Sequence, residues 1–301
     1  MTTTTPPPAV NTGQPNDDLD NTAPRTFWRR LVEKRAAMVS LVFLAALAVV
    51  AILARFIAPH DPAQINLYLV NAAPSADHLL GTDDLGRDVL SRLLHASQLS
   101  LMAPLQAVSI ALVIGLPLGL ASGYLGGRVD NVIMRVNDAI MAFPALILAV
   151  VIVGLLGPSL PNAMTAIGIV YGPRIMRVVR GSALSVREDV YVTAARAIGC
   201  SGLRTVLRHI LPNILGPLVV QVTVLLGHSL LAEAALSFLG LGVQPPEASW
   251  GAMLGRSFPY LGVNPVPLIA AGVVISVTVL SLNLLGDGLR DSVGAERKEG
   301  R

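Results

Sequence analysis

The segment from Ser100 to Gly123 reads SLMAPLQAVSIALVIGLPLGLASG and carries no charged residue over its 24 positions. About 20 consecutive apolar residues are enough for an α-helix to cross the roughly 30 Å hydrocarbon core of a bilayer. Because hydrocarbon offers no hydrogen-bonding partner, a backbone in that environment has to satisfy its own N–H and C=O groups, as a helix does. The segment therefore predicts a transmembrane helix and indicates that the chain is a membrane protein.

The whole chain shares this character. Apolar residues make up 53% of it, charged residues 14%, and the mean hydropathy is +0.63, whereas soluble domains carry about 25% charge. We expect an all-α membrane protein with six transmembrane helices, at residues 37–58, 100–123, 133–156, 162–180, 216–240 and 266–286. The fourth is the least apolar because Arg174, Arg177 and Arg180 follow its apolar part. We expect it to pack inside the bundle, with its last turns in water.

Three glycines recur four residues apart in the second predicted helix, at Gly115, Gly119 and Gly123. Residues four apart lie on one face of a helix, and glycine on that face lets another helix approach closely. We interpret this stripe as a packing surface.

The basic residues are distributed unevenly. If the N-terminus is cytoplasmic, 18 of the 22 Lys and Arg residues are on the cytoplasmic side. They lie before the first helix, between the second and third, between the fourth and fifth, and after the sixth. Lys and Arg concentrate on the cytoplasmic side of membrane proteins, so both termini are predicted to be cytoplasmic. The net charge of +3 then requires no nucleic-acid partner.

This topology divides the chain into segments. Residues 1–35 form a cytoplasmic segment that is rich in Thr, Pro and Asn and basic near its end, and we expect it to be disordered. Residues 36–292 form the six-helix domain, with an outer loop at 59–98 and a cytoplasmic loop at 181–215, and residues 293–301 form a cytoplasmic tail. The first helix starts too late and is too long for a signal peptide, so we expect an uncleaved anchor.

The cytoplasmic loop contains Tyr191-Val-Thr-Ala-Ala-Arg-Ala-Ile-Gly199, followed by His209-Ile-Leu-Pro212. Small side chains at Ala194 and Ala195 would let a helix sit deep in a groove of a partner protein. We expect Gly199 to end that helix in the left-handed conformation that glycine adopts readily. We expect Pro212 to stop a second short helix before the fifth span. The loop arginines either contact acidic groups of the partner or only fix the topology: Arg187, Arg196, Arg204 and Arg208.

The outer loop carries the sequence His78-Leu-Leu-Gly-Thr-Asp-Asp-Leu-Gly-Arg-Asp-Val-Leu-Ser-Arg92. Asp83 or Asp84 is expected to cap an interfacial helix, whose apolar face would carry Val89, Leu90, Leu93 and Leu94. Several polar side chains also suggest metal ligands: Asp77, His78, Asp83, Asp84, Asp88 and His95. Their spacing matches no recognised ligand set, so we predict neither a metal site nor a cofactor.

Two acidic residues fall within predicted helices. Glu233 lies midway along the fifth, and Asp138 lies near the start of the third, three residues after Arg135, with which it could pair. Charged groups at membrane depth are functional candidates, so both are candidates for a gate or the substrate path. For Glu233 a buried structural hydrogen bond is the alternative.

Three motifs, in this order, resemble one family. The family is the C-type permease subunit of ATP-binding-cassette (ABC) importers for dipeptides, oligopeptides and nickel. The motifs similar to it are Gly81-Thr-Asp-x-x-Gly-Arg-Asp88, the loop from Tyr191 to Pro212, and Glu233-Ala-Ala-Leu-Ser-Phe-Leu-Gly-Leu-Gly242. The loop departs from the family pattern at Thr193, where Glu is usual, and at His209, where Ile is usual.

The resemblance implies a type I ABC importer permease fold in a bacterial cytoplasmic membrane. It implies a second permease subunit, two separate ATPases and an extracytoplasmic substrate-binding protein as partners. Peptides are the expected substrate, and nickel or another small solute is the alternative. The residues that it assigns to ATPase coupling are Tyr191, Thr193, Ala194, Ala195, Gly199, Leu211 and Pro212.

Two other classes compete with a permease subunit. A secondary transporter would show broken helices at matching positions of two repeats, and a membrane enzyme would show clustered catalytic side chains; we find no convincing instance of either. The two lysines, Lys34 and Lys298, do not lie in a G-x-x-x-x-G-K-[ST] phosphate loop. We therefore expect no enzyme activity in this chain, with ATP hydrolysed by partner chains.

Overall fold

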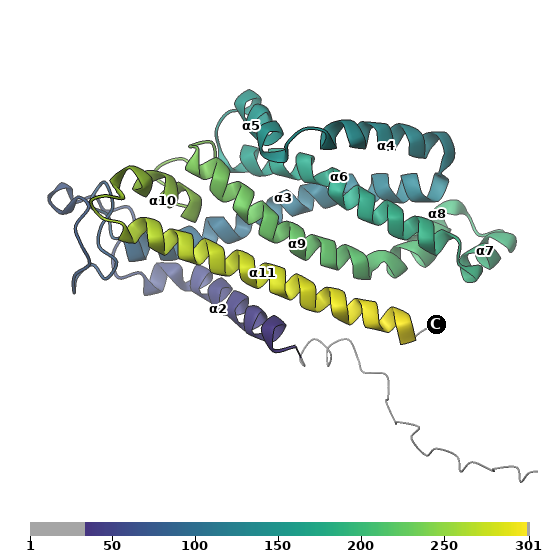
Figure 1. Ribbon diagram of the computed structural model, residues 1–301, viewed down its shortest axis with the longest axis horizontal. Helices are drawn as coiled ribbons and strands as arrows, with labels where there is room; N and C mark the ends of the chain where they lie inside the picture. Colours follow the sequence, from purple (N-terminus) through teal and green to yellow (C-terminus); the bar gives the residue numbers. More distant parts are fainter. Residues whose placement is uncertain (1–33, 300–301) are drawn as a thin grey trace, which may run out of the picture.

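A computed structural model describes residues 34–299, with side chains described as far as residue 292, and the fold is all-helical. The disorder predicted for residues 1–35 falls almost entirely outside the described residues. Short helical turns lie at Leu67–Leu69, Val206–Ile210 and Phe258–Tyr260. The helices in Figure 1 are α2 (Arg35–Ile57), α3 (Val89–Leu125), α4 (Gly127–Met141), α5 (Ala145–Leu156), α6 (Leu160–Arg187), α7 (Val190–Ala197), α8 (Gly202–Thr205), α9 (Leu211–Phe238), α10 (Trp250–Ser257) and α11 (Val266–Glu299).

Four helical segments are long and apolar enough to cross a membrane: Arg35–Ile57, Val89–Leu125, Gly202–Phe238 and Val266–Ser292. They coincide with the first, second, fifth and sixth predicted spans, so the all-α membrane fold is confirmed. Figure 1 shows them running along the length of the molecule. Helix α3 begins inside the predicted outer loop, and α6 continues into the predicted cytoplasmic loop, so both loops are shorter than expected.

The third predicted span, residues 133–156, is not one straight helix. The chain forms α4 and α5 there, and their axes are bent by 89°. Pro144 accounts for the break, because it has no N–H to donate and its ring disfavours a helical backbone at Phe143. Hydropathy averaged over residues 133–156 hides the turn, because α4 carries Arg135 and Asp138 and is amphipathic, whereas α5 is apolar throughout.

The fourth predicted span corresponds to α6, which packs against α3, α5 and α9. The backbones of α3 and α6 approach each other very closely. A Cβ atom added at Gly115 would lie 2.5 Å from the Gly172 carbonyl oxygen, and one added at Gly119 would lie 2.7 Å from that of Met176. The glycine stripe is therefore a packing surface, as predicted.

The two ends of the bundle carry different segments (Figure 1). Helices α7 and α8 and the C-terminal end of α11 lie at one end, which we call the α7 end. Helix α10 and the loop of residues 58–88 lie at the opposite end, the α10 end. Lys34 donates a hydrogen bond to Asp291, so the start of α2 and the last part of α11 lie together.

Candidate functional site

The helix that sequence analysis assigns to coupling is α7, Val190–Ala197, and its C-terminal end has a well-defined structure. The Gly199 N–H donates to the Arg196 carbonyl oxygen and the Cys200 N–H donates to that of Ala195, both at 3.0 Å. Gly199 has a φ of +85°. This pair of bonds with a left-handed residue is the Schellman ending that glycine favours, so the predicted role of Gly199 in ending the helix is confirmed.

Helix α7 has a buried face and an exposed face. Val192 and Ala195 are buried against the chain itself, whereas Thr193 and Ala194 are exposed. The idea that Ala194 and Ala195 together form a docking face is therefore wrong for Ala195. Successive residues of a helix point about 100° apart, so the adjacent Ala194 and Ala195 have different surroundings here, one exposed and one covered by the chain itself.

Apolar side chains that sequence analysis did not single out are exposed around α7. Val190 is 84% exposed, Ile198 is 86% exposed and Leu203, in α8, is 71% exposed. Single exposed apolar residues are common on proteins. Three of them lie within 14 residues, on the connection between α6 and α9, and we refer to these three residues together as the α7 patch.

The α7 segment is fastened to the end of α3. The Arg196 guanidinium carbon lies 4.7 Å from the centroid of the Tyr124 ring, within cation–π range. Arg187 donates to two carbonyl oxygens in the last turn of α3, at 3.2 and 3.4 Å. Arg204 and Arg208 are exposed, and within the described part of the chain neither has an ion-pair partner. Two of the four loop arginines are thus engaged internally, and two are left for other contacts.

Pro212 does not stop a short helix, contrary to our prediction. Residues 202–210 form helical turns that run directly into α9, and Pro212 lies in the first turn of α9. The preceding residues, Val206–Ile210, form a π-helical turn. Such a turn is wider, which relieves the contact that a proline ring makes with the carbonyl group four residues earlier. Leu211 begins α9, and the ring of His209 lies 6.4 Å from that of Tyr191, measured between centroids.

Glu233 is fully buried in α9. Its Oε1 accepts a hydrogen bond from the Ser237 hydroxyl at 2.7 Å, and its Oε2 has no partner among the described residues. Helix α10 packs tightly on the same part of α9, because a Cβ atom added at Gly251 would lie 2.5 Å from the Ala234 Cα. The carboxyl group is therefore enclosed, and one of its oxygens is held.

Asp138 pairs with α6 rather than with Arg135. Its carboxylate accepts a hydrogen bond from Arg177 at 2.7 Å. Two turns earlier on α4, Asp130 accepts two hydrogen bonds from Arg180, at 2.6 and 2.7 Å. These pairs fasten α4 to α6. The expected partner was wrong because sequence spacing shows neighbours within one helix and not those on another.

The outer motif folds into a buried ion cluster at the α10 end. Asp83 lies 2.7 Å from Arg87 and 3.4 Å from Arg92, and these two arginines are only 4% and 3% exposed. Asp84 accepts a hydrogen bond from Arg256 of α10 at 2.7 Å. The cluster thereby joins the outer loop, the start of α3 and α10.

The residue that caps α3 is Asp88, not Asp83 or Asp84 as predicted. Asp88 Oδ2 accepts hydrogen bonds from the Ser91 N–H at 2.8 Å and from its hydroxyl at 2.7 Å. Burial raises the pKa of Asp88, but hydrogen bonds from Ser91 and His78 outweigh it, so the pKa lies below its ordinary value. Helix α3 begins at Val89, so Asp88 alone is at the capping position. Asp83 Oδ1 instead accepts hydrogen bonds from the Leu85 and Arg87 N–H groups of the preceding turn.

The helical architecture agrees with a known class of protein. Residues 115–296, more than half of the chain, match the family described as the binding-protein-dependent transport system inner membrane component. Residues 23–74 match the N-terminal transmembrane domain of oligopeptide transport permease C. The chain belongs to this family, the permease subunits of ABC importers, in which ATP hydrolysis and substrate capture belong to other subunits.

Particular relatives are similar over nearly their full length. A dipeptide transport system permease protein of Alkalihalophilus pseudofirmus is 40% identical over 292 residues, 97% of this chain and 96% of that protein. A glutathione transport system permease protein of Escherichia coli strain 536 is 42% identical over 273 residues, 90% of each chain. A solved inward-facing structure of the MetNI methionine ABC transporter has a TM-score of 0.57 and 22% identity, covering 68% of this chain and 97% of that chain. The prediction of an ABC importer permease is confirmed, and so is the all-helical fold of such a permease, with four or five of the six predicted spans found among the described residues.

Proposed function

We propose that this chain is one of two permease subunits of a bacterial ATP-driven importer whose substrates are peptides. The support is its similarity, over nearly the whole chain, to permeases named for dipeptides and for glutathione, which is itself a small peptide. In this proposal the second permease completes the path, two ATPases supply the energy, and an extracytoplasmic binding protein delivers the substrate.

Helix α7 is proposed to be the element that docks on an ATPase, and the observation that carries this is the α7 patch. Val190, Ile198 and Leu203 expose apolar surface next to Arg204 and Arg208. A patch of exposed apolar residues beside unpaired charges is typical of a protein–protein interface. The ATPase would cover the apolar side chains and supply acidic groups to the two arginines.

The proposed topology has six crossings, with the α7 end in the cytoplasm. Four segments and the bent α4–α5 pair account for five. Helix α6 would be the sixth, because its 28 residues extend about 42 Å and two of its arginines are paired with α4. An even number of crossings brings both ends of the chain to one side, in agreement with the contact between Lys34 and Asp291. The many arginines at the α7 end favour the cytoplasm there.

The docking proposal is tested by placing a charge in the α7 patch. Ile198→Asp and Leu203→Asp should leave folding intact because both side chains are exposed. They should abolish co-purification of the ATPase and uptake of a labelled dipeptide into membrane vesicles. Leu79→Asp is the matched control, since Leu79 is 60% exposed at the α10 end. If both patch variants keep bound ATPase and wild-type uptake, α7 is not the docking element.

Substrate class needs its own measurement. Vesicles that contain the complete importer should take up a labelled dipeptide in an ATP-dependent manner. Uptake of Ni²⁺ without uptake of any dipeptide or oligopeptide would replace the peptide proposal with the nickel alternative.

Glu233 and Asp138 remain the candidates for the gate or path. Glu233→Ala should leave the assembled complex intact and change transport or basal ATPase rate if Glu233 belongs to the path. Loss of assembly or of thermal stability would assign Glu233 a structural role, as its hydrogen bond with Ser237 suggests.

For Asp138, the variants Asp138→Asn and Arg177→Gln distinguish a path role from an inter-helix ion pair. Equal effects of the two variants on transport and stability indicate the ion pair.

A further inference from the structure

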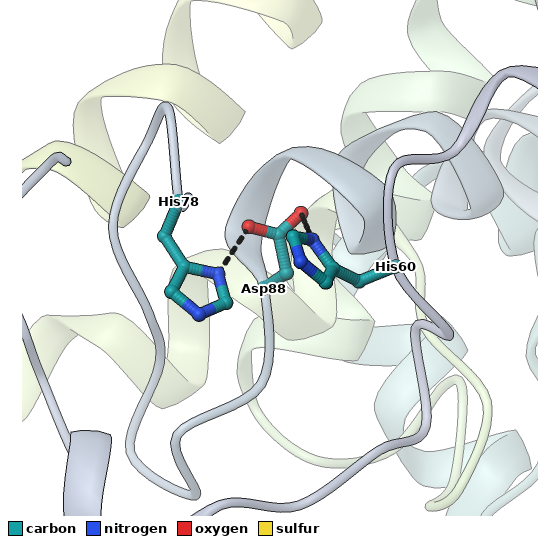
Figure 2. Close-up of side chains that lie close together, drawn as sticks. All are labelled: His60, His78 and Asp88. Atoms are coloured by element: carbon teal, nitrogen blue, oxygen red, sulfur yellow. Dashed lines mark hydrogen bonds and ion pairs between the residues drawn. The ribbon is translucent and has the colours of Figure 1, made fainter. Parts of the chain in front are cut away.

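The loop at the α10 end brings together three side chains that are distant in sequence: His60, His78 and Asp88. Figure 2 shows one oxygen of the Asp88 carboxylate directed at a ring nitrogen of His78 and the other at a ring nitrogen of His60. His78 Nδ1 lies 2.9 Å from Asp88 Oδ1, and His60 Nδ1 lies 3.8 Å from Asp88 Oδ2. His60 was not among the candidate ligands of the sequence analysis.

The spacing of these atoms suits a metal ion. One ligand atom from each of the three residues lies within 4.8 Å of the others. Zinc bonds of about 2.0–2.2 Å in a tetrahedral arrangement place neighbouring ligand atoms about 3.3 Å apart. The 2.9 Å between His78 Nδ1 and Asp88 Oδ1 is slightly shorter than that value, and the 4.8 Å limit on all three ligand atoms leaves room for the third to reach it by a small side-chain movement. Two imidazole nitrogens and a carboxylate oxygen are ligands that Zn²⁺ and neighbouring divalent ions accept.

Hydrogen bonding explains only part of the cluster. Asp88 caps α3 and bonds to His78, so these two residues are satisfied. The Nδ1 atom of His60 is buried and has no hydrogen-bond partner among the described residues, which is unusual for a buried polar atom. A pocket of about 100 Å³ opens over the cluster and is also lined by Asp61, Gln64 and Asn66, so water ligands have room to complete a coordination sphere.

We propose that His60, His78 and Asp88 bind a divalent transition-metal ion, with Zn²⁺ the best match to the ligands. The ion takes the place of the proton between His78 and Asp88: His78 binds through Nδ1 as a neutral imidazole that carries its proton on Nε2. Asp88 keeps Oδ2 for the cap of α3. The bound ion ties the residues that follow α2 to the start of α3. The site lies at the opposite end from α7 and does not depend on the proposed coupling or substrate.

The test uses the assembled importer, purified through a tag that contains no histidine and titrated with Zn²⁺. Wild-type complex should bind one more Zn²⁺ per copy of this chain than His60→Ala complex, or bind that ion about 100-fold more tightly. His60→Ala is the informative variant because the ring is partly exposed and makes no hydrogen bond through Nδ1, so folding should be unaffected. Co²⁺ in place of Zn²⁺ should give visible d–d absorption that is lost in the same variant.

His95→Ala is the matched control, since His95 lies in α3 outside the cluster and should bind the ion like wild type. His78→Gln should also lose the ion. Equal Zn²⁺ stoichiometry and affinity in wild type and His60→Ala would overturn the proposal, and so would an equal loss in His95→Ala. Absence of Zn²⁺ binding to the wild-type complex would overturn it as well. Because the readout is metal binding, failure here leaves the transport proposal unaffected.

Discussion

The α10 end and the α7 end of the bundle differ in how their side chains are satisfied. At the α10 end Arg87 and Arg92 are buried beside Asp83. Trp250 there is fully buried, with its indole N–H donating to the Leu93 carbonyl oxygen at 3.1 Å. At the α7 end the α7 patch exposes apolar side chains. Groups paired within the chain support its own stability, whereas exposed apolar groups gain only when a partner covers them. We therefore expect substitutions at the α10 end to affect folding and those at the α7 end to affect assembly.

The largest effect on stability is expected from Asp83→Asn. The variant removes the carboxylate that lies beside the buried guanidinium groups of Arg87 and Arg92. Removing one member of a buried ion pair lowers the free energy of unfolding by about 3–5 kcal/mol. Thermal unfolding of the detergent-purified protein should show a markedly lower midpoint. Asp77→Asn is the control, because Asp77 is an exposed carboxylate in the same loop. Equal midpoints for the two variants would show that the cluster does not stabilise this end.

Gly251→Ala should give the next largest effect. The added methyl group would lie 2.5 Å from the Ala234 Cα, so α10 has to shift on α9, and overpacking of this kind costs about 1–3 kcal/mol. Gly181→Ala is the control, since a Cβ atom there meets nothing within 4 Å. A thermal midpoint for Gly251→Ala that equals or exceeds that of Gly181→Ala would contradict the close approach of the two helices.

A smaller and purely local effect is expected from Gly199→Ala at the α7 end. A Cβ atom there also meets nothing within 4 Å, but φ is +85°, and a left-handed conformation costs a non-glycine residue about 1–2 kcal/mol. Hydrogen exchange should become faster in residues 190–200 and stay unchanged in α3 and α6. Slower uptake with an unchanged thermal midpoint would fit the proposed coupling role. A lower midpoint for the whole chain would show instead that this end also supports the fold.

Thr193→Glu should have the smallest effect. The side chain is exposed, and substitutions at such positions usually change stability by less than about 0.5 kcal/mol. A negative charge in the first turn of α7 is favourable to the helix and restores the residue usual in the family. ATPase co-purification should be equal to or stronger than that of wild type. Weaker co-purification would mean that the partner surface at this position is itself acidic.

Features that depend on neighbouring residues in the sequence were predicted more successfully than features that depend on contacts between distant parts of the chain. The apolar stretch of α3 and the helix-ending Gly199 depend on nearby residues alone, and both were predicted. The cap of α3 was assigned to the wrong aspartate because Asp83, Asp84 and Asp88 are all capable of capping, and the residue at which the helix begins, Val89, depends on how the preceding loop folds. The exposure of Ile198 was missed because an apolar residue in sequence resembles a core residue.

The cluster around Asp88 illustrates the same limit. His60 is 18 residues before His78 and lies at the far side of a loop with no regular pattern. No spacing rule brings the two together, since loop conformation sets their distance. The bend at Pro144 was missed although the sequence carries a signal for it. Arg135 and Asp138 make α4 amphipathic, whereas α5 is apolar throughout, and the two helices run in different directions.

Helix α3 has one further consequence, which follows from its length. Its 37 residues extend about 55 Å, whereas the hydrocarbon core of a bilayer is about 30 Å thick. A helix of this length that crosses along the bilayer normal extends about 25 Å in total beyond the hydrocarbon core, into the headgroup regions and water, and a tilted one extends somewhat less. Its first turn is capped by Asp88, and Tyr124, in its last turn, supports Arg196 of α7. The α10 end and the α7 end contrasted above are thus the two ends of one continuous helix, whose hydrogen-bond ladder is interrupted where Pro104 and Pro117 lack an N–H.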